Sequence, residues 1–116
     1  MVDKIVYIET EKDKYPMLFS LNVIESIQNE YGSYTKWGDL VSQNGGKEVD
    51  IKALKFGICE AINEGIEVEN EENNSQRKLI TLKQAGRILT EVGTQKIKEK
   101  LKEMIADGED NGDEKN

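Results

Sequence analysis

The stretch of residues 19–41 constrains the fold more than any other part of this sequence, because it joins two short helical patterns through one glycine. Apolar residues recur at helical spacing on both sides of Gly32, at Leu21, Ile24, Ile27 and Tyr31, then at Tyr34, Trp37, Leu40 and Val41. Glycine commonly ends a helix, and Ser20 and Ser33 precede the two patterns as candidate N-caps. The chain has one Trp, four Tyr and two Phe, and four of these seven aromatic residues lie here. We therefore expect a helix, a tight joint and a second helix, with aromatic side chains that fix a core or a binding surface.

The N-terminal region has the pattern of a β-hairpin. Residues 2–9 alternate in character, so that Val6 and Ile8 share one face of an extended strand. A charged turn leads to a second extended run, residues 15–19, in which Pro16 is tolerated only at a sheet edge or at the start of a strand. These features predict two short strands that form a small hairpin.

Three further helical patterns follow. A third helix is expected to begin at its N-cap Asp50 and to end before Gly65, and a fourth to run from its cap Thr81 to Gly93, after which a fifth begins. The residues expected to face the core are Ile51, Leu54, Ile58, Ala61 and Ile62 in the third helix, Leu82, Ala85, Ile88, Leu89 and Val92 in the fourth, and Ile97, Leu101, Met104 and Ile105 in the fifth. The fold class predicted is α+β, mainly α: a short N-terminal β-hairpin followed by about five helices.

The length of 116 residues predicts a single domain, which we place at residues 1–106. Of the formal net charge of -7, residues 64–74 contribute five acids and no base, and residues 107–116 contribute five acids and one base. We expect the first of these segments to be a mobile, solvated loop and the second to be a disordered acidic tail. The negative global field disfavours nonspecific binding of nucleic acid.

The sequence has little material for catalysis or for metal binding. It contains no histidine and the single cysteine Cys59, so the usual nucleophile triads and zinc sites cannot be built. Gly45, Gly46 and Lys47 are followed by glutamate where a phosphate loop needs Ser or Thr, and the acidic tail lacks the closing glutamate of a calcium loop. No apolar run approaches the ~20 residues of a membrane span. We therefore expect no enzyme activity, no catalytic residue, no cofactor, no metal and no membrane contact.

Two other classes of function have some support in the sequence. The fourth and fifth helices, joined at Gly93, could form a DNA-binding helix-turn-helix with Lys96, Lys98, Lys100 and Lys102 as its basic side. Alternate lysines point about 200° apart around a helix, however, so they do not line one edge. An acidic inhibitor or DNA mimic is the other class, and it would need carboxylates fixed on a rigid surface.

Three stretches of the sequence resemble one family. These are SLNVIESIQNEYGSYTKWGDLV, DIKALKFGICEAINEGIEVENEEN and LITLKQAGRILTEVG, at residues 20–41, 50–73 and 79–93. Together they look like the tail assembly chaperones of long-tailed phages and prophages of Gram-positive bacteria. The resemblance covers about residues 5–104, nearly all of the predicted domain.

The resemblance implies a non-catalytic chaperone that binds the tape measure protein and helps tail tube subunits to assemble around it. It also implies that the protein acts in the cytoplasm of the infected or lysogenic bacterial host and is absent from the mature virion. Neither nucleic acid nor a membrane is an expected partner, whereas self-association is compatible with the family resemblance.

Three aromatic residues are candidates for the partner-binding surface. Trp37 and Phe56 could offer apolar surface to a helical client, and Tyr34 lies beside the Gly32 joint. Aromatic residues within a periodic stripe are more often part of the core, so the alternative for each is a structural role.

Overall fold

The computed structural model describes residues 5–42 and 48–113, with side chains as far as Glu103. The described residues form one two-stranded antiparallel sheet and five helices. The elements are β1 (Val6–Glu9), β2 (Lys14–Met17), α1 (Leu21–Tyr31), α2 (Tyr34–Val41), α3 (Ile51–Asn73), α4 (Leu82–Val92) and α5 (Thr94–Asp113). The predicted fold class, a hairpin followed by about five helices, is therefore confirmed.

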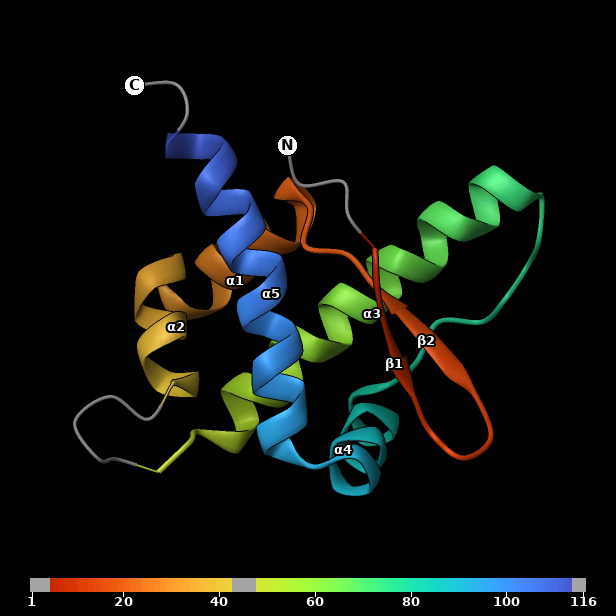
Figure 1. Ribbon diagram of the computed structural model, residues 1–116, viewed down its shortest axis with the longest axis horizontal. Helices are drawn as coiled ribbons and strands as arrows, with labels where there is room; N and C mark the ends of the chain where they lie inside the picture. The colour runs from red at the N-terminus through yellow and green to blue at the C-terminus, as the bar shows by residue number, and fades with distance from the viewer. Residues whose placement is uncertain (1–4, 43–47, 114–116) are drawn as a thin grey trace.

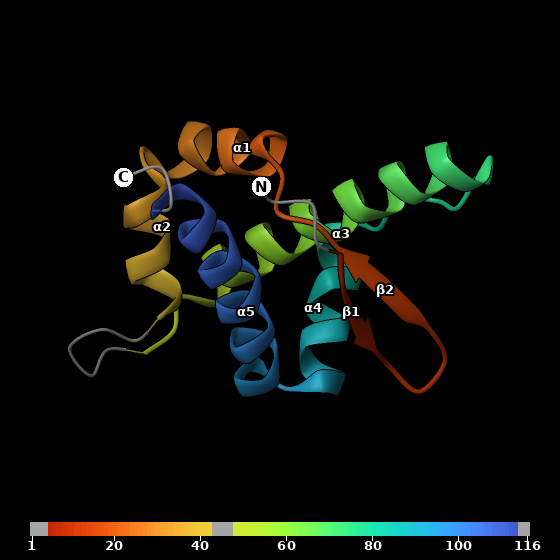
Figure 2. The same cartoon turned by 45° about the horizontal axis from the view of Figure 1, so that its top comes forward.

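The long helix α3 is the centre of the arrangement. The hairpin, α1, α2 and α4 all pack against it, and α5 contacts α4 and β1. In both views α5 lies between α2 and the hairpin (Figures 1 and 2). Buried apolar side chains from every one of these elements form one core cluster.

The hairpin has the alternation that the sequence predicts. Val6 and Ile8 are buried, whereas Tyr7 between them is exposed. Pro16 pairs with Tyr7 in the register, and its carbonyl oxygen faces α3 instead of β1. Its missing N–H therefore costs the hairpin no ladder hydrogen bond. The strands pair with each other within the chain.

The predicted end of the third helix at Gly65 is wrong, because α3 continues to Asn73. Gly65 is buried where β2 crosses the helix, and a Cβ atom there would lie 2.6 Å from the carbonyl oxygen of Pro16. The glycine thus serves the close approach of strand and helix, and it does not stop the helix. Asn74, in the left-handed conformation with φ 54°, ends α3 instead.

The acidic segment 64–74 is consequently not the mobile loop that its composition predicts. Residues 64–73 form the second half of α3, and the Tyr7 hydroxyl donates a hydrogen bond to the Glu69 carboxylate. After the helix, the Asn70 side-chain oxygen accepts hydrogen bonds from the Ser75 hydroxyl at 2.9 Å and from the Arg77 N–H at 3.0 Å. Contacts with the hairpin and the following loop therefore hold the helix where charge alone predicts mobile chain.

Three of the four predicted N-caps are confirmed. Ser33, Asp50 and Thr81 each accept a hydrogen bond from a backbone N–H in the first turn of the helix that follows, and Thr81 also forms a capping box. Ser20 makes no such bond to α1. Its hydroxyl donates instead to the Glu64 carboxylate at 2.7 Å, because α3 brings that acceptor beside the start of α1.

Three residues predicted to face the core are exposed. Leu21 is 76 % exposed, Ile51 is 51 % exposed and Leu82 is 49 % exposed. Each is the first residue of its helix. The period of a sequence pattern gives the buried face of a helix, but it does not show that these first turns project beyond the neighbouring elements.

Several predictions concern residues outside the described part of the chain. These include a strand that begins at residue 2 and the loop at residues 44–47. The predicted inward positions of residues 104 and 105 concern side chains that are likewise not described. The bounds of α5 reach Asp113. The side chains beyond residue 103 are not described, so the domain boundary at 106 and the disordered tail stay predictions.

Candidate functional site

Trp37, the first of the candidate partner-binding residues, lies in the core. Its side chain is 0 % exposed, and its Nε1–H donates a hydrogen bond to the backbone oxygen of Ala53 at 2.8 Å. The ring lies on Gly57 of α3, where a Cβ atom would be 2.3 Å from Cζ2 of the tryptophan. In this conformation Trp37 has no surface with which to touch a partner directly, as the structural alternative expects.

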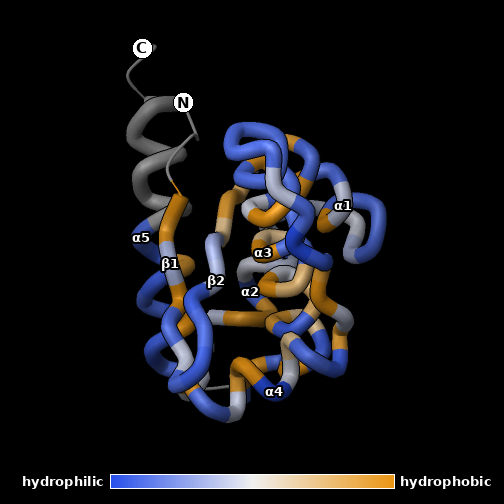
Figure 3. Tube along the Cα trace, turned by 90° about the vertical axis from the view of Figure 1, so that its right-hand side faces the viewer, coloured by the Kyte–Doolittle hydropathy of each residue, from blue (hydrophilic) through white to orange (hydrophobic). Residues whose placement is uncertain are grey.

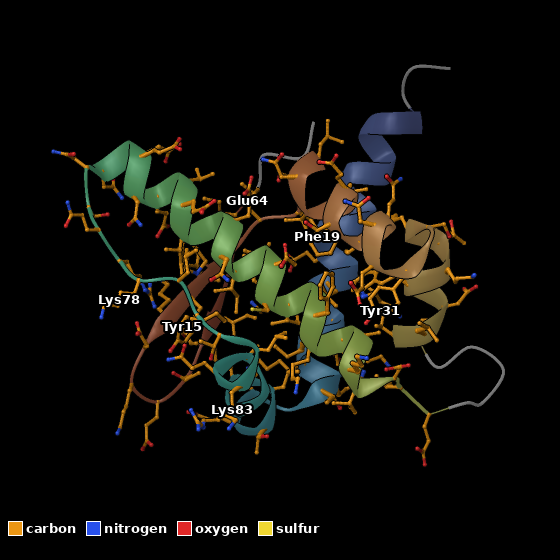
Figure 4. All side chains as sticks on the ribbon, turned by 180° about the vertical axis from the view of Figure 1, so that it is seen from behind. Tyr15, Phe19, Tyr31, Glu64, Lys78 and Lys83 are labelled. Carbon is orange, nitrogen blue, oxygen red and sulfur yellow. The ribbon has the colours of Figure 1, made fainter. Side chains whose placement is uncertain are left out.

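The three candidate residues belong to two aromatic groups. Tyr34 stacks on Trp37, with ring centroids 5.9 Å apart and planes at 15°, and Phe19 lies 5.7 Å from Trp37. Phe56 instead meets Tyr31 edge to face at 5.7 Å. Tyr34 and Phe56 are half-buried, so each keeps some accessible surface. Figure 4 shows Phe19 beside α1, and Tyr31, the last residue of α1, on the side where α3 crosses. Whether any of the three contacts a partner stays a prediction.

A groove between α2 and α5 lies directly beside Trp37. We call it the α2–α5 groove; its volume is about 360 Å³. Its lining consists of Trp37, Gly38, Val41, Ser42, Gln95, Lys98, Glu99, Leu101 and Lys102. A Cβ atom at Gly38 would meet nothing within 4 Å, so the backbone of α2 forms part of the open wall. The apolar floor and polar rim are the features with which a surface takes an apolar side chain of a partner.

Sequence reasoning finds only one edge of this groove. The residue type of Trp37 marks it as a candidate, but Leu101 lies on a different helix far along the chain, and no sequence pattern links the two. The glycine at position 38, inside a short helix, is the available signal. Glycine weakens a helix interior, so its presence there suggests a packing or binding reason.

A second hollow, of about 380 Å³, lies on the other side of α5 against the hairpin. It is lined by Tyr7, Ile8, Glu9, Lys14, Val92, Lys96 and Lys100. Lys96 and Lys100 thus lie on one side of α5, whereas Lys98 and Lys102 line the α2–α5 groove on the other. This placement confirms that the lysines of α5 wrap around the helix, and it gives no single basic edge for a DNA groove.

The acidic half of α3 presents a fixed row of carboxylates. Glu60, Glu64 and Glu67 line a shallow hollow of about 310 Å³ that α1 and Leu79 complete. Glu64 accepts hydrogen bonds from the Ser20 hydroxyl and, at 3.3 Å, from the Asn22 side chain. Figure 4 shows Glu64 on α3, where that helix passes the start of α1. The helical placement means that these acids do not lie in the mobile chain that the sequence predicts, which was the objection to an acidic mimic, although Glu64 already serves the fold.

Two asparagines of α3 have structural roles that the sequence does not reveal. The Asn63 side chain accepts from the Ile80 N–H at 2.7 Å and donates to the Ile80 oxygen at 3.0 Å. Asn70 binds the backbone of Arg77 in the same two ways, at 3.0 Å each. Each side chain therefore replaces a backbone partner for the extended segment before α4, which satisfies groups that would be costly to leave unpaired.

No catalytic constellation emerges among the described residues. Cys59 is buried, and its pKa is raised, first by that burial and then by the nearby charge of Glu60. Within the described ranges, no group of three or more His, Cys, Asp or Glu residues is placed to hold a metal ion. The helices of the described chain include none whose length and apolar character would let it cross a membrane.

Comparisons of the chain with protein-family models, with curated proteins and with solved structures found no match. The family resemblance of residues 20–41, 50–73 and 79–93 therefore rests on the motifs of the sequence.

Proposed function

We propose that this protein is a phage tail assembly chaperone that binds the tape measure protein during tail assembly, together with tail tube subunits, and has no catalytic role. The motifs around Gly32, Gly57 and Gly93 support the family. We also propose that it acts in the cytoplasm of the bacterial host and is absent from the mature virion.

The α2–α5 groove is the observation on which this proposal depends most. A tape measure protein is a long helical chain, and a helix is recognised through apolar anchor residues that enter a groove. The groove has about 360 Å³ of open volume; its lining includes Val41 and Leu101, and the Trp37 ring beside it is itself buried. That volume is near the lower end of ligand pockets, which suits one or two anchor side chains of a helix.

The charge of the rim is compatible with this use. Lys98, Glu99 and Lys102 stand at the edge of the groove and keep its surroundings hydrated. A strongly charged exterior, with 34 % charged residues in the whole chain, keeps a protein dispersed while it holds an aggregation-prone client.

The proposal is tested by co-expression with the tape measure protein of the same phage or prophage. The expected result is a complex that co-elutes in size-exclusion chromatography and that keeps the tape measure protein in solution. The variant Gly38→Arg places a long side chain in the groove without a backbone clash, because a Cβ atom there meets no other atom within 4 Å. We expect it to weaken the complex at least tenfold.

Gly86→Arg is the matched control. Gly86 also lies inside a helix, and its Cβ atom would meet only the flexible Lys55 side chain at 3.2 Å. It is not among the residues that line the α2–α5 groove. Both variants should keep the melting temperature. Equal binding by Gly38→Arg and Gly86→Arg would exclude this groove, and the absence of any complex with the unmodified chain would exclude the proposed function.

The DNA-binding alternative makes a different prediction. A helix-turn-helix regulator would bind a labelled duplex at low salt, and its affinity would fall steeply as salt increases. We expect no such binding, because the lysines of α5 face two different hollows.

A further inference from the structure

Among the described residues, helix α5 makes fewer contacts with the other elements than any other helix does. Within residues 94–103, Ile97 and Leu101 are the two buried side chains, and hollows of about 380 and 360 Å³ lie on either side of the helix. Hydrophilic residues dominate the described part of α5 in Figure 3. By contrast, α3 is buried along much of its length. Few contacts and open flanks make α5 the helix that separates most easily from the core.

A single residue connects α5 to the rest of the chain. Helix α4 ends at Val92, Gly93 has a φ of +96°, and α5 begins at Thr94. The N–H of Gly93 caps α4 through the oxygen of Leu89 at 2.8 Å, and its own oxygen accepts from Ile97 at 3.2 Å. An L-residue rarely adopts this φ, so the bend that returns α5 to its own core depends on glycine.

A second copy of the chain has the same binding site for α5, which we call the α5 seat. The seat lies between the hairpin and α2, where Ile8 and Trp37 are almost fully buried. If Gly93 straightens, α4 and α5 continue as one helix, and α5 moves away from its own seat. The identical seat of another copy then accepts Ile97 and Leu101 through the contacts already made within one chain. The interface is therefore continuous with an existing one, and the exchange is reciprocal.

We propose that α5 is an exchangeable arm that pivots at Gly93, and that two copies of this protein associate by swapping their α5 helices. This self-association does not depend on the proposed chaperone function, because it uses only contacts of the chain with itself.

The test is the oligomeric state of the full chain over a range of concentrations, measured by analytical ultracentrifugation. Gly93→Ala disfavours the bend and favours a continuous helix, so we expect the dimer dissociation constant to fall at least tenfold. Gly86→Ala is the matched control, since Gly86 lies inside α4, outside the hinge and outside both hollows beside α5, and a Cβ atom there would meet only the flexible Lys55 side chain at 3.2 Å. It should leave the dissociation constant unchanged.

Two further variants separate a swapped dimer from other outcomes. Adding Ile97→Ala and Leu101→Ala to Gly93→Ala removes the arm's anchors and should abolish the dimer. Inserting three glycines directly before Thr94 in the Gly93→Ala chain should restore the monomer, because α5 can then reach its own seat. A Gly93→Ala chain that stays monomeric and folded, or a dimer that survives loss of both anchors, would overturn the proposal. If Gly93→Ala does not fold, failure of the three-glycine insertion to restore a folded monomer would equally count against the hinge.

Discussion

A glycine-to-alanine change at position 57 should strongly destabilise the protein, although alanine is the better helix former. Gly57 lies in the second turn of α3, under the ring of Trp37. A Cβ atom at this position would lie 2.3 Å from Cζ2 and 2.9 Å from Cε2 of the tryptophan. Real carbon atoms do not approach so closely, so either the ring or the helix must move.

Neither movement is cheap. The Trp37 ring is held by its hydrogen bond to the Ala53 oxygen at 2.8 Å and by its contacts with Tyr34 and Phe19. Alanine in place of glycine contributes about 1 kcal/mol to helix stability. Overpacking costs about 1–3 kcal/mol, and a buried indole N–H that loses its acceptor costs about 1–3 kcal/mol more. The net effect of Gly57→Ala should therefore be a loss of about 1–5 kcal/mol in the free energy of unfolding.

Gly38→Ala provides a control with the same chemistry. Gly38 also lies in a helix, but a Cβ atom there meets nothing within 4 Å. We expect this variant to be stabilised by up to about 1 kcal/mol. Urea unfolding followed by circular dichroism measures both values, and the two variants should differ by about 2–6 kcal/mol.

A double variant tests whether the clash with the Trp37 ring causes the loss of stability. In Gly57→Ala/Trp37→Leu the clashing ring is absent, so the double variant should be more stable than the sum of the two single losses predicts. A Gly57→Ala protein as stable as the unmodified chain, or an additive double variant, would refute the packing that we describe.

Three other predictions follow from individual contacts. Asp50→Ala removes the cap of α3, in which the carboxylate accepts from the Ala53 N–H at 3.0 Å, and should lower the free energy of unfolding by about 1 kcal/mol in urea titrations. Asn63→Ala leaves the Ile80 N–H without its acceptor and leaves the Ile80 oxygen with only the weak donor of the Cys59 thiol, so it should cost about 1–3 kcal/mol; an effect below that of Asp50→Ala would contradict the described role. Because the pKa of Cys59 is raised above its ordinary value of 9.0, the folded protein holds this proton more tightly than the unfolded chain does. Its contribution to stability is complete below pH 9.0 and is lost as the pH rises through the folded pKa. Urea titrations between pH 8 and 10 should show a smaller decline for Cys59→Ala, and an identical pH profile would exclude the effect.

The elements are easier to predict from the sequence than their ends. Local signals such as the caps Asp50 and Thr81 and the glycine at position 32 act over one helical turn, so they can be read without a neighbour. The prediction of a helix end at Gly65 fails because the strand that requires this glycine lies far away in the sequence, at Pro16. The prediction that Leu21 is buried fails for a related reason. The pattern shows towards which side of the helix the side chain points, but not how far the neighbouring elements extend to cover it.

For the candidate site, the sequence identifies Trp37 but not its surroundings. The aromatic side chain and its helical spacing indicate that this residue fixes a core or a binding surface. The structure shows that it fixes the junction of α2 with α3. The open volume beside it depends on where α5 lies relative to α2, and no local pattern encodes that distance.

The order and type of the elements follow from the sequence, since hydrophobic period, caps and turn residues are properties of neighbours along the chain. Only the folded arrangement explains why the acidic segment 64–74 is mostly helix, why Ser20 binds Glu64 instead of capping α1, and why α5 lies between two hollows. Each of these features depends on contacts between residues far apart in sequence. Their energies come from burial and from hydrogen bonds that exist only once the chain has folded.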